Sequence, residues 1–269
     1  MPTAHEHAMR ELLAFYQEAG VDAAIGETPV NRLAEEVATP PQPERPPPAA
    51  APRMITARDL GTNLNAPPSP DAAVMAAREA AGTAATLDDL RAMLDRFEGC
   101  ALRTTATQLV FGRGNPQARV MFVGEAPGYE EDKSGLPFVG RSGHLLDRMM
   151  AAIGLDETNA YIANIVPWRP PGNRTPTPQE SATCLPFIKR QIELSRAEIL
   201  VCLGGPSAQT LLNTRDGITK SRGRWYPFPA GSRDLRALAT FHPAFLLRSP
   251  LQKRLAWRDF LALKKALGQ

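Results

Sequence analysis

Cysteine is scarce in this chain of 269 residues, and its scarcity excludes a class of folds. The three cysteines, Cys100, Cys184 and Cys202, are odd in number and lie far apart in the sequence. They cannot form the dense disulfide framework of a small secreted domain. Free, widely spaced cysteines are typical of a protein in a reducing compartment.

Long apolar runs are also missing. No stretch approaches about eighteen consecutive apolar residues, the length that a membrane-spanning helix needs. Residues 1–6 contain neither the basic nor the apolar region of a secretory signal. We therefore expect a cytoplasmic protein that makes no contact with a membrane. We also expect it to be a monomer.

Charge is nearly balanced over the whole chain, at a formal net value of +3, but the two signs are separated along it. Residues 1–99 contain 8 Lys/Arg and 15 Asp/Glu, a balance of −7, whereas the rest contain 23 and 13, a balance of +10. A basic region attracts polyanions and gains affinity by releasing the counterions of nucleic acid. The basic part of the chain is therefore where we expect nucleic acid to bind, although charge alone does not separate this from a solvated surface.

Proline divides the chain into parts. Residues 40–70 hold ten of the 26 prolines, a composition that favours extended conformers and cannot bury a core. Before them, apolar residues at helical spacing predict one or two amphipathic helices, which could bind a protein partner. We expect an N-terminal helical segment over 1–38, a Pro/Ala-rich linker over 39–75 and a folded domain over 82–269.

From about residue 119 the sequence repeats strand, loop and helix four times. The strand-like runs lie at 120–123, 161–166, 199–203 and 238–241. Helical patterns separate them: Ser142 is placed to cap one helix, and Thr177 and Glu180 have the spacing of a capping box in another. This alternation predicts a three-layer α/β/α sandwich around a central four-stranded, mainly parallel sheet.

Glycine and polar side chains stand where these strands end. The segment 124–128 follows the first run, Asn164 lies late in the second, and His242 follows the fourth. Ligands of parallel sheets bind at the carboxyl ends of the strands, so we expect these residues to share one site. Each has a structural alternative, because a histidine can bond locally and an asparagine can cap a turn.

Four blocks in this order resemble the family 4 uracil-DNA glycosylases. The blocks are Gly-Glu-Ala-Pro-Gly at 124–128, Gly-Leu-Pro-Phe-Val-Gly-Arg at 135–141, Arg-Pro-Pro-Gly-Asn-Arg at 169–174 and His-Pro-Ala-Phe-Leu-Leu-Arg at 242–248. The resemblance covers residues 97–265. It implies a DNA repair enzyme that acts on uracil-containing DNA, hydrolysing the N-glycosidic bond of deoxyuridine to release uracil and leave an abasic site.

The resemblance also implies catalytic roles. Cleavage passes through an oxocarbenium-like sugar and a departing uracil anion, so the site needs a donor near the anion and a group that holds water. His242 is the candidate donor. Glu125 or Glu131 could position water or oppose the charge of the sugar, unless the second of these belongs to a solvated acidic loop. The catalytic set that we expect is Glu125, Glu131, Asn164 and His242.

Base recognition is expected from the same blocks. The resemblance implies that Phe138 stacks on uracil, and a loop between two glycine-bearing turns is a poor place for a core phenylalanine. The Asn164 amide offers one acceptor and two donors, which suits the imide edge of uracil. The substrate-binding set that we expect is Gly124, Ala126, Pro127, Gly128, Phe138 and Asn164.

Contacts to DNA are expected from two segments. Leu246 and Leu247 resemble the family's wedge, which fills the gap left by a flipped base, and Arg248 would meet phosphate. Lys220 and Arg222 lie in a second basic run that resembles another family segment. A run of charge is otherwise only a solvated face.

One part of the resemblance fails. Members of the family hold a 4Fe–4S cluster through four cysteines, and here only Cys100 and Cys184 stand at those positions. Phe97 and Trp168 occupy the other two, and their rings offer no donor atom for iron. We therefore expect neither a metal nor another cofactor, with the two rings filling the space of the cluster.

Two other functions stay open. One is a glycosylase that removes other deaminated bases; the branch that captures the abasic sugar covalently carries an insertion whose histidine is lacking in residues 220–224. The other is a non-catalytic DNA-binding repair adaptor. The intact set of Glu125, Phe138, Asn164 and His242 weighs against the adaptor.

Overall fold

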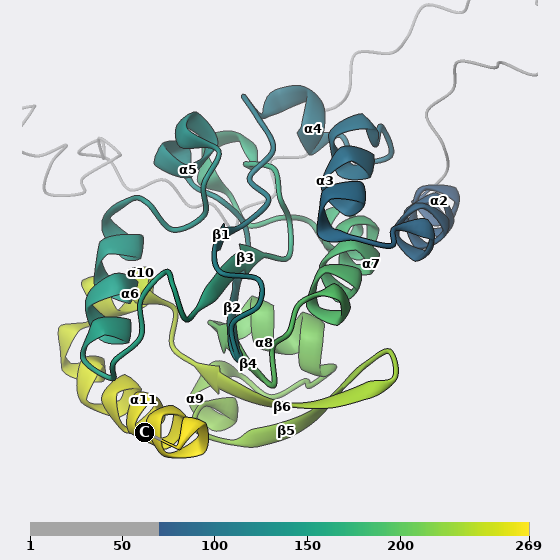
Figure 1. Ribbon diagram of the computed structural model, residues 1–269. Helices are drawn as coiled ribbons and strands as arrows, with labels where there is room; N and C mark the ends of the chain where they lie inside the picture. The colour runs from purple at the N-terminus through teal and green to yellow at the C-terminus, as the bar shows by residue number, and fades with distance from the viewer. Residues whose placement is uncertain (1–69, 269) are drawn as a thin grey trace, which may run out of the picture. The chain divides into compact units, whose positions relative to one another are not determined.

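The computed structural model describes residues 70–268 (Figure 1). The helices predicted within 1–38 and most of the linker predicted over 39–75 lie outside these residues. The last predicted linker residues belong to helix α2 (Pro70–Thr83), which buries Ala77 and Ala81 in the core. The folded unit therefore extends upstream of residue 82, where we expected it to begin.

A six-stranded sheet in the order β1-β3-β2-β4-β6-β5 forms the centre of this unit. Its four middle strands are parallel, as predicted, and they are β2 (Val120–Gly124), β3 (Tyr161–Asn164), β4 (Ile199–Leu203) and β6 (Arg233–Thr240). Every residue of β2, β3 and β4 is buried, as strands covered on both faces require. The α/β class is thereby confirmed.

Two antiparallel edge strands make the sheet larger than predicted. The first, β1 (Arg113–Gly114), has only two residues and leaves no periodic pattern to detect. The second, β5 (Trp225–Ala230), contains Pro227 and Pro229. Proline cannot donate to a ladder and is tolerated at an edge, so these residues hide the strand from pattern analysis.

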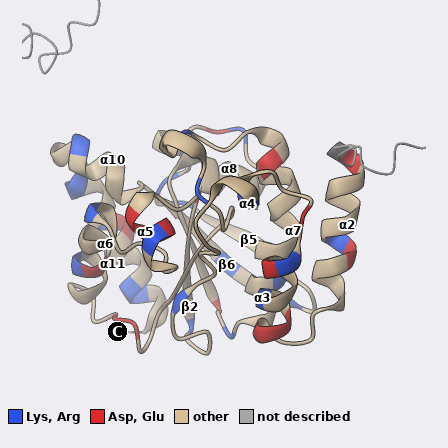
Figure 2. Ribbon diagram, turned by 90° about the horizontal axis from the view of Figure 1, so that it is seen from above, with Lys and Arg blue, Asp and Glu red and all other residues tan. Residues whose placement is uncertain are grey.

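Helices cover both faces of the sheet (Figures 1 and 2). One face packs against α2, α3 (Leu87–Arg96), α7 (Pro178–Leu194) and α8 (Gly205–Leu212). The other packs against α6 (Arg141–Ala151) and α11 (Lys253–Leu267). Alternate residues of β2 enter the two cores: Met121 faces the first and Phe122 the second.

Short elements complete the unit at the loops. They are α4 (Leu102–Thr105), α5 (Tyr129–Ser134), η1 (Pro171–Asn173), α9 (Ile218–Ser221), α10 (Pro243–Arg248) and η2 (Pro250–Gln252). Among all helices of residues 70–268, none combines the length and apolar character that crossing a membrane requires.

The helix caps test the local predictions. The capping box of Thr177 and Glu180 is present at the start of α7, as predicted. Ser142 does not cap α6, because that helix begins one residue earlier, at Arg141, with Gly140 as its N-cap. Ser142 therefore lies in the first turn of α6, and its hydroxyl does not cap the helix.

Candidate active site

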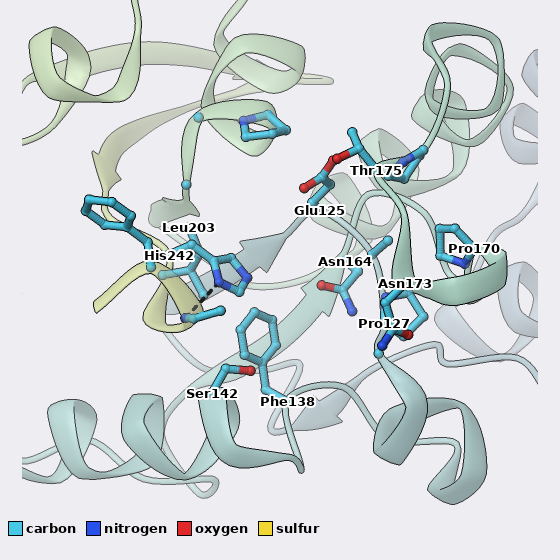
Figure 3. A pocket seen from close by; sticks show the side chains of 18 of the residues that line it. Glu125, Pro127, Phe138, Ser142, Asn164, Pro170, Asn173, Thr175, Leu203 and His242 are labelled. Carbon is cyan, nitrogen blue, oxygen red and sulfur yellow. Dashed lines mark hydrogen bonds between the residues drawn. The ribbon is translucent and has the colours of Figure 1, made fainter. Parts of the chain in front are cut away.

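A cavity of about 480 Å³ opens at the carboxyl ends of the parallel strands (Figure 3). Most of the residues that we assigned to the site from the sequence line it, and these are Glu125, Ala126, Pro127, Gly128, Glu131, Phe138, Asn164, His242 and Arg248. Gly124 lies buried beneath them: a Cβ there would lie 2.4 Å from Asn164 Oδ1 and 2.6 Å from the Phe138 ring. The topology of the sheet therefore gathers four separate sequence blocks into one place.

Asn164 ends β3 with its side chain in this cavity and is 4% exposed. Neither its Oδ1 nor its Nδ2 atom has a hydrogen-bond partner among the described residues. An unpaired buried amide costs about 1–3 kcal/mol, so such groups persist where a ligand pairs with them. The amide therefore marks where a ligand with both a donor and an acceptor would bind.

Phe138 forms a wall of the cavity, with its ring centroid 5.5 Å from that of His242. It is also 4% exposed and packs in a core cluster, so the expectation that this loop is a poor place for a core phenylalanine is wrong. Its φ angle is +57°, a left-handed conformation that is uncommon for a phenylalanine. Gly143 permits the close approach of this backbone, since a Cβ at that position would lie 1.7 Å from the Phe138 carbonyl oxygen. Figure 3 shows the side chains of His242, Phe138 and Asn164 around one space.

Glu131 holds the loop that carries this ring. Its Oε1 atom accepts hydrogen bonds from the backbone N–H groups of Val139 (3.0 Å) and Gly140 (2.9 Å), and its Oε2 atom accepts one from Gly128 (3.1 Å). The residue is 7% exposed. Glu131 therefore does not belong to a solvated loop, and its carboxylate is engaged in positioning the backbone on both sides of the cavity.

His242 follows β6 and caps the N-terminus of α10. Its Nδ1 atom accepts a hydrogen bond from the N–H of Ala244 at 3.1 Å, so the proton of the neutral ring lies on Nε2. Burial lowers the pKa of His242 to about 4, with a further contribution from the positive charge of Arg248 and an opposing one from Glu131. The side chain is therefore a neutral hydrogen-bond donor at physiological pH.

Glu125 presents its carboxylate to the same cavity. Among residues 70–268 it forms no side-chain hydrogen bond and no ion pair that would occupy its oxygens, and burial raises its pKa. A carboxylate in this state can accept a proton or a hydrogen bond from water. Glu125 therefore fits the role of the water-binding group better than Glu131, whose oxygens are already engaged.

Of the residues predicted to contact DNA, some have accessible side chains and others are engaged inside the protein. Arg248 and Lys220 are exposed, and Leu247 is partly exposed on α10. Leu246 is fully buried in a cluster with Leu145, so the predicted wedge role of Leu246 is not compatible with this structure. Consecutive helical residues point in different directions, and only one of the two leucines can face outward.

The side chain of Arg222 also does not contact solvent in the way that its predicted role in DNA binding requires. Its guanidinium forms an ion pair with buried Asp259, donates to the carbonyl oxygen of Leu255 at 2.6 Å, and lies 5.5 Å from the ring centroid of Phe241. The arginine thus ties α9 to α11, and its charge is neutralised inside the protein. Phosphate contact by Arg222 would break these bonds.

Several residues of the cavity were not assigned to the site from the sequence. Ser142, Asn173, Leu203, Gly204 and Phe241 also line it. Gly204 adopts a φ angle of +93°, and a Cβ there would lie 3.0 Å from the His242 Cβ. The signal available was its place directly after a strand, at an end that the fold makes part of the site.

Cys100 and Cys184 lie side by side in the core, where an iron–sulfur cluster of the family type would need four ligands. The Sγ atoms of Cys100 and Cys184 are 3.9 Å apart, and the hydrogen bond between them lowers the pKa of Cys100 and raises that of Cys184. Trp168 is 2% exposed in the same core, and the Phe97 ring packs edge-on against Phe187 at 4.9 Å. Two thiols beside a phenyl ring and an indole ring do not supply four ligands, so these residues do not fit the cluster.

Comparison with known proteins agrees with the geometry. The model of the uracil DNA glycosylase superfamily matches residues 111–261. The chain belongs to the uracil-DNA glycosylase superfamily. The matched span includes the blocks at 124–128 and 242–248, which contribute residues to the cavity.

Relatives within the superfamily define the similarity further. A type-4 uracil-DNA glycosylase of Archaeoglobus fulgidus is 38% identical over 188 residues, which cover 68% of this chain and 94% of that protein. A type-4 enzyme of Thermotoga maritima is 42% identical over 151 residues, 56% of this chain and 77% of the relative. A type-5 uracil-DNA glycosylase of Thermus thermophilus is 30% identical over 151 residues, which cover 49% of this chain and 67% of that protein. The resemblance to family 4 is thus confirmed.

Proposed function

We propose that this protein is a uracil-DNA glycosylase that hydrolyses the N-glycosidic bond of deoxyuridine in DNA, the first step of base excision repair. The observation that carries the proposal is the unpaired, buried amide of Asn164, in a cavity that also holds Phe138 and the neutral donor His242. The type-4 relatives, which are named for this activity, support it.

Recognition of the base follows from hydrogen-bond complementarity. Uracil presents an N3–H donor beside the O4 acceptor, and the Asn164 amide presents Oδ1 and Nδ2–H. Cytosine offers an unprotonated N3 and an amino group in those places, so an amide in the orientation that pairs with uracil cannot pair with cytosine on either side. A site built in this way rejects the wrong base because its own buried groups are then left unpaired. Phe138 supplies a surface on which the ring stacks.

Cleavage separates a sugar cation from a pyrimidine anion. As the C1′–N1 bond breaks, its electron pair stays with uracil, and the negative charge spreads to O2, where the Nε2–H of His242 would donate a hydrogen bond. A neutral donor is suited to this task because it stabilises the anion without first having to be protonated. Water then bonds to C1′ and loses a proton, which the Glu125 carboxylate would accept directly or through solvent.

The nucleotide must leave the duplex to reach this cavity. Of the residues assigned to DNA from the sequence, Leu247, Arg248 and Lys220 remain in our proposal because their side chains are accessible. Arg248 also lines the cavity, so its guanidinium can meet a phosphate next to the flipped nucleotide. Leu246 and Arg222 are left out, since both are engaged inside the protein.

We further propose that the protein works as a cytoplasmic monomer without a cluster. The support for the second part is the donor chemistry around Cys100 and Cys184, where Phe97 and Trp168 stand at the other two ligand positions. Anaerobically purified protein should be colourless and contain no stoichiometric iron or sulfide. About four irons per chain would overturn this part of the proposal.

Single-turnover assays on uracil-containing oligonucleotides test the function. His242→Ala should lower the excision rate by roughly a hundredfold or more while affinity for abasic DNA stays nearly unchanged, as expected when a transition-state contact is lost. Asn164→Asp should abolish uracil excision, because a carboxylate repels O4. His144→Ala is the matched control, since His144 is exposed on α6 and does not line the cavity. An unchanged rate in both site variants would refute the assignment, and a wild-type protein that binds DNA without excision would favour the adaptor.

A further inference from the structure

We propose that a groove between α6, α10 and α11 docks an acidic segment of a partner protein through one bulky apolar side chain. The groove has a volume of about 210 Å³ and is separate from the uracil cavity. Its lining is almost wholly apolar, with two cationic side chains, and consists of Leu145, Arg148, Met149, Ala152, Leu246, Lys253, Ala256 and Trp257.

The apolar part of this surface extends beyond the groove. Trp257 is 41% exposed although it lines the groove, and Leu261 and Leu251 are 45% and 85% exposed. These three account for half of the six large apolar side chains that are exposed within residues 70–268. An accessible tryptophan beside an open apolar groove is typical of a protein interaction site.

The charge of the surrounding helices defines the partner. Arg148, Lys253, Arg254 and Arg258 are exposed on α6 and α11, and Figure 2 shows basic residues over this side of the molecule. The only carboxylates on α6, α10 and α11 belong to residues 147 and 259, and both are already paired, with arginines 113 and 222. The positive charges around the groove are therefore not neutralised by described residues, and they complement an acidic segment.

A protein partner can place an apolar side chain in the groove, whereas the backbone of DNA cannot. The phosphate backbone would be attracted by Arg148 and Lys253, but it has no side chain to fill the groove and would leave Trp257 in solvent. A phenylalanine, leucine or isoleucine would fill the apolar groove, and flanking Asp and Glu residues would pair with Arg148 and Lys253 at its rim. The combination of an apolar floor with a basic rim therefore favours an acidic peptide with an apolar anchor.

The groove and the uracil cavity share helix α10. Leu246 forms part of the groove and belongs to α10, whose N-cap is His242. The docked segment would thus lie on the outer side of the helix that carries the proposed donor, and it would leave the uracil cavity open. This inference does not depend on the proposed function, because its test needs no excision.

Synthetic peptides provide the test. A fluorescein-labelled peptide Asp-Glu-Asp-Asp-Phe-Leu is titrated with the full-length protein, with Asn-Gln-Asn-Asn-Phe-Leu and Asp-Glu-Asp-Asp-Ser-Ser as comparisons. We expect saturable binding of the first only, accompanied by a change in tryptophan fluorescence that Trp257→Phe removes. Arg148→Glu with Lys253→Glu should weaken binding at least tenfold. The control pair, Arg91→Glu with Lys189→Glu, replaces exposed cations on α3 and α7 and should leave binding unchanged.

Four results would overturn the proposal. Equal binding of the serine peptide would show attraction by charge alone, and equal weakening by the control pair would show that no particular site is used. If the groove pair weakened binding of uracil-free duplex DNA as strongly as it weakened peptide binding, the surface would belong to DNA. Sedimentation of the unliganded protein as a dimer that Trp257→Ala dissociates would assign the groove to a second copy.

Discussion

Replacing Glu131 with glutamine removes a charge from the residue that joins the two sides of the uracil cavity. Glutamine keeps one oxygen, which can still accept from Val139 and Gly140, but its NH₂ group would face the N–H of Gly128. Hydrogen bonds to a charged group contribute about 1.5–3 kcal/mol, neutral ones about 1, and an unpaired buried donor costs about 1–3 kcal/mol. We therefore expect the free energy of unfolding to fall by at least about 3 kcal/mol.

The same change should slow excision. The loop held by Glu131 carries Phe138 in its left-handed conformation, and a displacement of about 1 Å in a positioning group can cost a factor of about 100 in rate. We expect at least a tenfold loss of single-turnover rate, measured at a temperature where urea denaturation shows the variant to be folded. Glu130→Gln is the control, because the preceding glutamate is exposed. A Glu131→Gln protein as stable and as fast as the control would refute the positioning role.

Three other perturbations follow from the structure. Trp168→Ala should lower the free energy of unfolding by about 3–5 kcal/mol in urea denaturation, because the ring is 2% exposed; a loss below about 1 kcal/mol would show that the ring is not a core element. The excision rate should rise with pH through the pKa of Glu125, which burial raises, because only the ionised carboxylate accepts a proton. Glu125→Gln should remove that rise. Because His242 stays neutral above about pH 4, the residual rate of this variant should be flat from about pH 5 upward. A chain starting at residue 70 should keep both activity and stability, whereas one starting at residue 82 loses α2 and should unfold at lower urea concentration; loss of excision by the folded longer chain would show that residues 1–69 take part in the chemistry.

The parallel strands were predictable because each is a short apolar run that the fold buries on both faces. The gathering of Asn164 and His242 was predictable for a related reason, since parallel strands bring their carboxyl ends to one edge. The capping box at Thr177 is encoded within four residues and needs no tertiary information. Where the determinants are local or follow from topology, sequence and structure agree.

Features set by distant partners could not be derived in this way. Arg222 lies in a basic run, and only its contact with Asp259, 37 residues further along, shows that its charge serves the interior. The two leucines 246 and 247 have the same chemistry, and the packing of α10 decides which of them is buried. Glu131 stands in an acidic cluster, and the backbone groups that it binds lie up to nine residues away.

The unpaired amide of Asn164 bears on turnover as well as on recognition. Free uracil carries the same N3–H and O4 groups as the base in DNA, so the product can satisfy the amide as well as the substrate does. A pocket that gains by pairing its own buried group will release the base slowly and will be open to product inhibition. Uracil added to the protein should therefore raise its melting temperature and slow excision, and the residue that selects the base would also limit how soon the next one can enter.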